Sequence, residues 1–372
     1  MKKQTIITFL LFIATISLFS CNEKIKLVGE FKETALIYGI LDQSESVHLI
    51  KINRAFIGPG NANDIAKIPD SSYFQNVNAT VYEYVDQVLT KSWVLEDTIL
   101  DTKNTNGIFY APLAKFYFFK TDNSVSPLNN AATYKLEVII NKGLASEFSV
   151  TGETTLISGL QCNMSNNAQV LNIFESNPPS PGYISDNIKV TNTGKSAIIN
   201  NTLIINIEEY QGTTLINTFS PSWSTRESQL SSADVTFSSP VQGQTFYELI
   251  RDNVSSNNNA IDLRRLKSYT IKITGGAIEL NNYINANKPS SSLAQTKPSY
   301  TNLKVSNDKN VIGIFSARQT ITIERPFKNS MLANVTCLDH KSRKELCTGI
   351  TTGNLFFKSN FSQDALQSFY QP

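Results

Sequence analysis

Residues 35–52 read ALIYGILDQSESVHLIKI and hold two apolar runs around a polar turn. The first run covers 35–41, the turn covers 42–46 and the second run covers 47–52. In the second run His48, Ile50 and Ile52 share one face at the two-residue period of a strand. Two such runs around a short polar turn predict an antiparallel β-hairpin. Because it lies beside isoleucines, His48 is expected to be a partly buried structural residue and not a ligand.

Strand patterns continue after this hairpin. Short runs rich in β-branched and aromatic residues occur at 77–85, 88–95, 107–111, 116–119, 134–140 and 148–154, with turns between them. Strands at this spacing are typical of an antiparallel β-sandwich of the immunoglobulin type. We therefore predict an all-β protein whose first domain, 33–158, is an immunoglobulin-like β-sandwich.

Two segments of this domain allow two interpretations each. The run FYFF at 116–119 is apolar on both faces. It is either a central strand covered on both sides, which we favour because Phe and Tyr are ordinary core residues, or a strand with one face at an interface. The loop 57–74 is unusually long and contains Asp64, Asp70 and Tyr73. We favour a solvated excursion, with a binding loop as the alternative.

A Ser-, Asn- and Pro-rich segment at 159–182 predicts a linker, because such composition marks domain boundaries. Strand patterns resume beyond it and predict a second β-rich domain at 183–330, so the chain is expected to hold two tandem β-sandwich domains. Two short helices are expected within it. One begins near Thr245, which has capping-box spacing to Glu248, and the other covers 277–285. The last segment, 331–372, is expected to form a hairpin and a tail.

The first 20 residues predict a secretory signal peptide. Lys2 and Lys3 precede a mostly apolar stretch at 6–19, which is too short to span a bilayer as a helix. Residues 18–21 read LFSC and resemble a bacterial lipobox, which implies cleavage before Cys21 and lipid attachment to its thiol. Several acyl chains give stable membrane anchoring where a single one is marginal. We expect residues 21–32 to be a lipidated tether; the alternative is a secreted protein that is cleaved elsewhere.

Three further cysteines follow Cys21. Cys337 and Cys347 flank a charged stretch that resembles a hairpin tip, and export to an oxidising compartment favours a disulfide between them. The alternative is a metal site that adds His340, but no second His or Cys-x-x-Cys pair lies near. Cys162 is the odd thiol and is expected to be a small core residue.

Composition excludes several classes of protein. Lys2 and Lys3 account for the formal charge of +2, so the rest of the chain is balanced, and a nucleic-acid binder would need clustered positive charge. The chain has only two His residues and lacks phosphate-loop, serine-hydrolase-elbow, zinc-protease and calcium-loop motifs. We therefore expect no cofactor, no bound metal and no enzymatic activity. A hydrolase that uses two carboxylates is the less favoured alternative.

Four aromatic residues are the candidates for ligand binding. Tyr73, Trp93, Tyr110 and Trp223 could stack on sugars if they are exposed, although core packing is the commoner role of such side chains.

Three local patterns resemble a family of Bacteroidota envelope lipoproteins known as domain of unknown function 4249. They are the strand pair at 35–52 after a short tether, the alternating runs at 77–81 and 134–138 with Gly143 and the strand at 148–155, and the late segments 266–273, 280–284 and 310–317. Together they cover residues 27–320. The acidic run that often follows the lipidated cysteine in this family is replaced here by NEKIK at 22–26.

The resemblance implies an outer-membrane lipoprotein, often encoded near TonB-dependent receptors and with no established activity. We expect a non-enzymatic binding or accessory protein that engages a receptor, another envelope protein or a nutrient ligand. The alternative is a surface glycan-binding protein or adhesin. The sequence does not decide between the periplasmic side and the cell surface.

Overall fold

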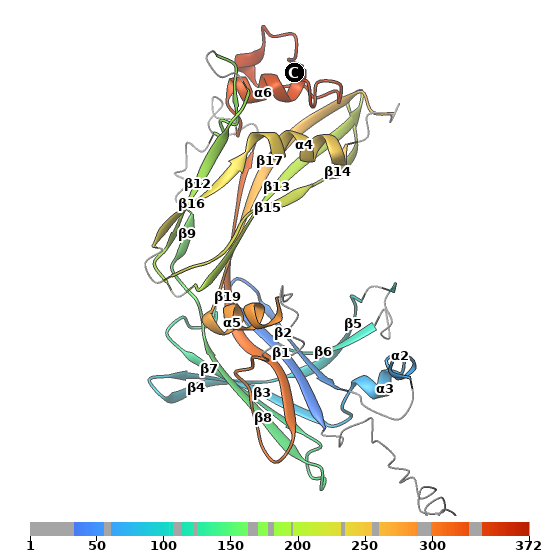
Figure 1. Ribbon diagram of the computed structural model, residues 1–372, viewed down its shortest axis with the longest axis vertical. Helices are drawn as coiled ribbons and strands as arrows, with labels where there is room; N and C mark the ends of the chain where they lie inside the picture. The colour runs from blue at the N-terminus through green and yellow to red at the C-terminus, as the bar shows by residue number, and fades with distance from the viewer. Residues whose placement is uncertain are drawn as a thin grey trace, which may run out of the picture.

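The computed structural model of the protein describes residues 33–55, 61–103, 105–106, 113–122, 125–162, 170–177, 182–194, 196–231, 235–254, 260–288, 299–326 and 337–371. The predicted signal peptide 1–20, Cys21, the tether 21–32 and the candidate residue Tyr110 lie outside them. Within the described residues the chain is mostly β, with strands in several sheets and five short helices, so the all-β prediction is confirmed. Figure 1 shows two lobes joined by long strands. We call 34–155 with 277–317 the N-terminal lobe, and 160–276 with 318–371 the C-terminal lobe.

The N-terminal lobe is a sandwich of two sheets. One has the strand order β18-β8-β7-β3-β4, and the other is the part β19-β1-β2-β6-β5 of a nine-stranded sheet. Their facing side chains, among them Ile37, Val81 and Leu136, form one buried core. The immunoglobulin-like subtype stays a prediction. The strands are β1 (Thr34–Asp42), β2 (Val47–Arg54), β3 (Val77–Val85), β4 (Val88–Val94), β5 (Glu96–Asp101), β6 (Leu113–Lys120), β7 (Thr133–Ile140), β8 (Phe148–Thr155), β18 (Lys304–Val305) and β19 (Asn310–Pro326).

The hairpin predicted at 35–52 is confirmed as β1 and β2, with Ile37 opposite Ile52. The strand predicted at 116–119 is β6, which lies between β2 and β5. Tyr117 and Phe119 are buried, whereas Phe116 and Phe118 are half-buried on the other face. This strand is therefore internal in its sheet but covered fully on one side only, so the favoured interpretation was wrong about its second face. The long loop 57–74 contains two single-turn helices, α2 (Ala62–Ile65) and α3 (Pro69–Ser72).

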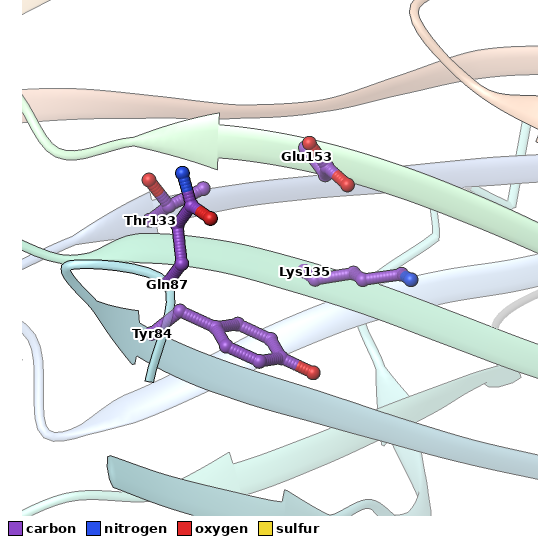
Figure 2. Close-up of a pocket in the computed structure, with 5 residues that line it drawn as sticks. All are labelled: Tyr84, Gln87, Thr133, Lys135 and Glu153. Carbon is purple, nitrogen blue, oxygen red and sulfur yellow. The ribbon is translucent and has the colours of Figure 1, made fainter. Parts of the chain in front are cut away.

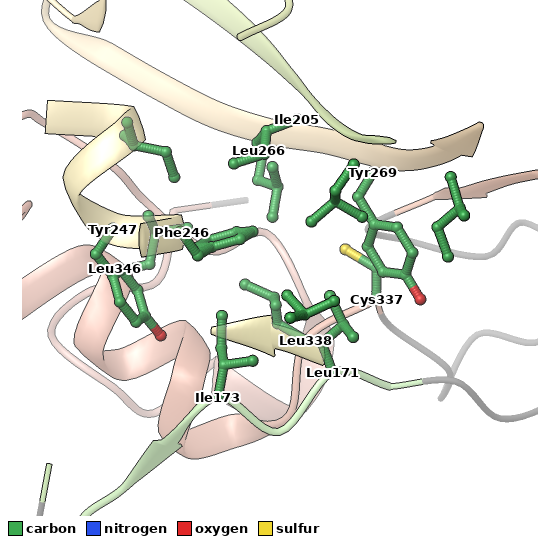
Figure 3. Close-up of a cluster of buried hydrophobic side chains, with 14 of the residues drawn as sticks. Leu171, Ile173, Ile205, Phe246, Tyr247, Leu266, Tyr269, Cys337, Leu338 and Leu346 are labelled. Atoms are coloured by element: carbon green, nitrogen blue, oxygen red, sulfur yellow. The ribbon is translucent and has the colours of Figure 1, made fainter. Parts of the chain in front are cut away.

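The C-terminal lobe is a second sandwich. A three-stranded sheet of order β16-β12-β9 faces the other part of the nine-stranded sheet, β14-β13-β17, with β15 beside β13. Their shared core is closed by helix α4 and the C-terminal tail, as Figure 3 shows for Phe246, Tyr247 and Leu346. The strands are β9 (Leu160–Cys162), β10 (Phe174–Glu175), β11 (Gly182–Tyr183), β12 (Ser185–Asn192), β13 (Ile198–Gln211), β14 (Thr214–Phe219), β15 (Ser222–Gln229), β16 (Thr236–Gln242) and β17 (Leu263–Gly276).

Strand β19 belongs to both lobes. Its first half pairs in parallel with β1, from Thr34 opposite Asn310 to Asp42 opposite Arg318, and its second half pairs antiparallel with β17. The close parallel approach requires a glycine, because Gly313 has φ of +122° and a Cβ there would lie 1.8 Å from the carbonyl oxygen of Ile37. Leu303 and Phe315 also pack in the N-terminal core. The chain therefore returns to the first lobe, so the predicted division at 159–182 into 33–158 and 183–330 is incomplete.

Both helices predicted in the second half are present. They are α4 (Gly243–Asn253) and α5 (Ile278–Asn287). The capping box predicted at Thr245 is not formed, because α4 begins two residues earlier, after the N-cap Gln242, which makes no side-chain cap hydrogen bond. Helix α5 covers β19 and β1 in the N-terminal lobe, where the hydroxyl of Tyr283 donates to that of Tyr38 at 3.2 Å.

The hairpin predicted around Cys337 and Cys347 is wrong. The residues between them form helix α6 (His340–Thr348), and the Asp339 side chain caps its start by accepting from the backbone N–H groups of Lys341 and Ser342. Cys337 lies before α6 and Cys347 lies near its end, so a helix and not a hairpin turn separates the two cysteines. Both cysteines are buried free thiols, so the predicted disulfide is absent.

The tail after α6 is fixed by a buried ion pair. The Arg343 guanidinium donates to both carboxylate oxygens of Asp364, at 2.7 and 3.0 Å, and Asp364 is fully buried in the short 3-10 helix η1 (Ser362–Asp364). Burial alone would raise the pKa of Asp364, but hydrogen bonds from Arg343, Ser359 and His340 lower it. A second buried pair, between Arg264 and Glu209 at 2.7 Å, holds β17 against β13. The Arg264 side chain also donates to the carbonyl of Leu355 in the tail.

Candidate functional site

The predicted aromatic residues that the structure describes do not form one site. Trp93 on β4 is half-buried against the N-terminal core, with its ring centroid 5.1 Å from that of Phe119. Trp223 on β15 is half-buried against the core of the other lobe, 6.4 Å from the ring of Phe246. Both tryptophans are therefore packing residues.

Tyr73 follows α3 and serves to attach this segment to the sandwich. Its hydroxyl accepts from the backbone N–H of Lys115 at 3.2 Å and from the ammonium of Lys103 at 3.3 Å. The Lys103 ammonium also lies 5.7 Å from the ring centroid of Tyr73. These contacts occupy the hydroxyl and one approach to the ring.

A hollow of about 450 Å³ lies on the outward face of the five-stranded sheet. Five side chains line it: Tyr84 from β3, Gln87 from the turn after β3, Thr133 and Lys135 from β7, and Glu153 from β8 (Figure 2). We call this set the sheet-face hollow. Its volume is within the range of small-molecule sites, roughly 300–1,000 Å³.

Alternation along three strands places these side chains together. On β7 the residues Tyr134 and Leu136 are buried, so Thr133 and Lys135 point outward. The register sets Tyr84 opposite Thr133 and Lys135 opposite Glu153. Neighbouring strands lie about 4.8 Å apart, so the outward side chains of β3, β7 and β8 form one continuous surface.

The end of β3 has an irregular strand pairing and an unusual backbone conformation. The pairing of β3 with β4 shifts register between Glu83 and Tyr84, and such bulges redirect side chains. The next two residues outside the strand, Asp86 and Gln87, have φ of +49° and +67°. Non-glycine residues in this region are uncommon, and two in succession form the tight primed turn that joins twisted strands. This turn places Gln87 at the rim of the hollow.

A buried carboxylate supports the hollow from beneath. Glu83 is 2% exposed and points inward, next to Tyr84 in the chain. It accepts from the hydroxyls of Tyr134 at 2.8 Å and Thr90 at 2.9 Å, and these bonds join β3, β7 and β4 below the site. Burial, followed by the bond to Glu83, raises the pKa of Tyr134. The strands that carry Tyr84 and Thr133 are thus held together by a buried polar network.

The side chains of the sheet-face hollow make no hydrogen bond or ion pair with any residue that the structure describes. Lys135 and Glu153 face each other on adjacent strands, yet they form no ion pair within 4.0 Å among those residues. In contrast, the neighbouring Tyr82 donates from its hydroxyl to Glu137 at 3.1 Å. Lysine, glutamate, glutamine and the two hydroxyls together supply donors and acceptors with no net charge.

The described residues do not assemble a Ser/His/Asp triad. His340 Nδ1 lies 2.9 Å from Asp364 Oδ1, and the Ser359 hydroxyl donates to Asp364 Oδ2 at 2.6 Å. Both groups bind the same carboxylate, so the imidazole is not placed to take the serine proton as a triad requires. The other histidine, His48, is 1% exposed, and Thr121 Oγ1 lies 2.9 Å from its Nε2. Burial lowers its pKa to about 4.

Metal ligands are not clustered in the part of the chain that the structure describes: it holds no group of three His, Cys, Asp or Glu side chains placed to bind an ion. The alternative site of Cys337, His340 and Cys347 is therefore not assembled. Burial raises the pKa of both thiols, that of Cys347 to about 12, so neither is a ready thiolate.

Models of known protein families do not match the chain, and a search of curated protein sequences also found no match. The resemblance to domain of unknown function 4249 therefore rests on its sequence patterns. None of the described helices is long and apolar enough to span a membrane.

The residues of the sheet-face hollow were not among those predicted from the sequence. Only Tyr84 has a signal in the sequence, because it forms an outward pair with Tyr82 on a strand whose inward residues are Ala79 and Val81. Aromatic residues at outward positions of a predicted strand are candidates for binding, because core packing does not explain them.

Proposed function

We propose that the protein is a non-enzymatic binding or accessory lipoprotein of the outer membrane. The observation that carries this proposal is the sheet-face hollow, whose polar side chains make no hydrogen bond or ion pair with the described residues. Elsewhere the buried charged groups Asp364, Arg343 and Arg264 are satisfied within the fold. The side chains of the sheet-face hollow keep their hydrogen-bonding groups available to a partner, which supports a binding role. The surroundings of His340 and His48 do not support catalysis.

The lipobox-like residues 18–21 support membrane attachment through Cys21. Strand β1 begins at Thr34, 13 residues further on, and an extended chain of that length reaches about 45 Å at most. The N-terminal lobe, which carries the hollow, would then lie nearer the membrane. The C-terminal lobe, with α6 at the far end of Figure 1, would face outward to a receptor or another envelope protein.

Fatty-acid labelling in cells that express the full chain tests the anchor. We expect the protein to incorporate label and a Cys21→Ala variant to lose both the label and the membrane fraction. A Cys162→Ala variant is the matched control and should keep both. Label that persists in Cys21→Ala would contradict attachment at this residue.

Affinity purification from detergent-solubilised membranes of the host tests the accessory role. We expect an outer-membrane protein, such as a TonB-dependent receptor, to co-purify in stoichiometric amount. Recovery of the protein alone, together with no bound small ligand by native mass spectrometry, would count against a binding role. Turnover of model glycosides or esters would favour the two-carboxylate hydrolase instead.

A surface glycan-binding protein or adhesin is the second candidate function. The half-buried aromatic pair Tyr82 and Tyr84 on the outward face of β3 favours it, because an outward-facing tyrosine combines an apolar ring with a hydroxyl.

A further inference from the structure

We propose that the sheet-face hollow binds an uncharged linear oligosaccharide, with one sugar ring on the face of Tyr84 and its hydroxyls bonded to Lys135 and Glu153. This inference rests on the proposed non-enzymatic binding function and names the chemical class of the ligand.

Tyr84 gives the hollow an aromatic surface. Tyr84 is half-buried at its base, and Figure 2 shows its ring lying along the sheet surface beside Lys135. The ring of Tyr82 follows two residues earlier on the same face, with centroids 6.4 Å apart and planes tilted by 45°. The Tyr84 ring offers an apolar surface within the hollow, and a sugar unit has an apolar face of C–H groups that packs on such a ring.

The charges of the hollow are balanced, and its side chains both donate and accept hydrogen bonds. An anionic ligand would need a surplus of cations, and a metal ion would need clustered carboxylates. The hollow contains one cation, Lys135, and one anion, Glu153, which face each other without pairing. Gln87 and Thr133 each donate and accept. A ligand that donates and accepts at many positions and has no net charge fits this set, and a sugar has these properties.

The hollow lies across several strands of the sheet. It runs over β3, β7 and β8 on the outer face of the sheet and is not enclosed within the core. A ligand there keeps its ends in solvent, so the site suits units within a longer chain. The bulge at Tyr84 and the buried bonds of Glu83 hold the binding residues in place before the ligand arrives, which lowers the entropic cost of binding.

A glycan array followed by calorimetry tests the proposal. The full chain is purified in a detergent without a sugar headgroup and applied to neutral and charged oligosaccharides. We expect binding to neutral linear chains. The Tyr84→Ala variant should bind at least about tenfold more weakly, whereas Tyr84→Phe should stay within about threefold, since it keeps the ring. Lys135→Met and Glu153→Gln should each weaken binding by about three- to tenfold.

The matched control is Tyr210→Ala. Tyr210 is also a half-buried tyrosine on a strand, and its hydroxyl donates to Glu208 at 2.8 Å, but it lies in the other lobe. This variant should bind like the wild type. Thermal unfolding of each variant verifies the fold, and Lys135→Met tests the site if Tyr84→Ala does not fold.

Three results would overturn the inference: no neutral oligosaccharide bound, binding of charged glycans only, or full affinity in both Tyr84→Ala and Lys135→Met. Failure here leaves the proposed function standing if a membrane partner still co-purifies. Loss of both the partner and the glycans would overturn the two proposals together.

Discussion

Two pairs of oppositely charged residues, one in each lobe, are placed in opposite ways. In the C-terminal lobe Arg343 and Asp364 are both at most 2% exposed, and Arg343 Nε lies 2.7 Å from Asp364 Oδ2. In the N-terminal lobe Lys135 and Glu153 stand opposite each other on adjacent strands and do not pair. The buried pair fixes the C-terminal tail in one arrangement, whereas the open pair keeps its capacity for hydrogen bonds. The two pairs therefore differ in role: the buried pair stabilises the fold, and the open pair is free to bind.

The largest expected effect comes from breaking the buried pair. Replacing Asp364→Ala leaves Arg343 as a buried, uncompensated charge, and the free energy of unfolding should fall by about 3–5 kcal/mol. Asp252→Ala is the control, because its pair with Arg251 is exposed on both sides and its loss should leave the free energy of unfolding nearly unchanged. Urea unfolding measures both. Equal losses of unfolding free energy in the two variants would contradict the distinct role of the buried pair.

The connection between the lobes can be tested at Gly313. Replacing Gly313→Ala forces a Cβ against the Ile37 carbonyl at positive φ, so the free energy of unfolding should fall by about 2–4 kcal/mol. Gly143→Ala is the matched control, since Gly143 also has positive φ but nothing within 4 Å of an added Cβ. It should cost about 1 kcal/mol. A similar cost at both sites would show that the β1–β19 contact tolerates a side chain.

A pH dependence is expected from the N-terminal core. His48 is buried as the neutral form, and its pKa is lowered from 6.5 to about 4 by burial. Between these values the unfolded chain binds a proton that the folded chain excludes, so stability present above pH 6.5 is lost as the pH falls toward 4. The loss should be about 2–3 kcal/mol, and a His48→Gln variant should show a smaller slope. Denaturant unfolding at several pH values checks this, and identical slopes would contradict it.

The smallest effect is expected from reduction. Because Cys337 and Cys347 are free thiols, a reducing agent should leave the unfolding free energy unchanged. A disulfide across such a short loop would have made a difference of about 2–3 kcal/mol. Alkylation of the unreduced, unfolded protein followed by peptide mass measurement should find both cysteines modified. Two unmodified peptides that remain linked through Cys337 and Cys347 would show that the disulfide is present.

Strand positions in this chain could be predicted because alternation is local. The hairpin at 35–52 and the helices α4 and α5 depend on residues near in sequence. Helix α6 could not be recognised, because its buried face contains Arg343, whose burial depends on Asp364 further along the chain. A charged residue on the core side hides the apolar period that marks a helix.

The sheet-face hollow could not be predicted from the sequence for a similar reason. Tyr84, Lys135 and Glu153 become neighbours only through the register of three strands. Sequence shows which residues point outward, but not which strands pair or where they align. The parallel pairing of β1 with β19 joins residues 276 positions apart, as in Asp42 and Arg318, and no local pattern predicts it.

The shared strand β19 also determines how the molecule would carry load. If Cys21 is anchored and a partner pulls on the C-terminal lobe, β1 is drawn from its Thr34 end and β19 from its Pro326 end. The two strands run in parallel with nine paired positions, so this tension acts along the strands and shears all their hydrogen bonds at once. Such a joint resists force far better than one whose bonds open singly. The lobes would therefore stay joined while tension passes between the membrane and a partner.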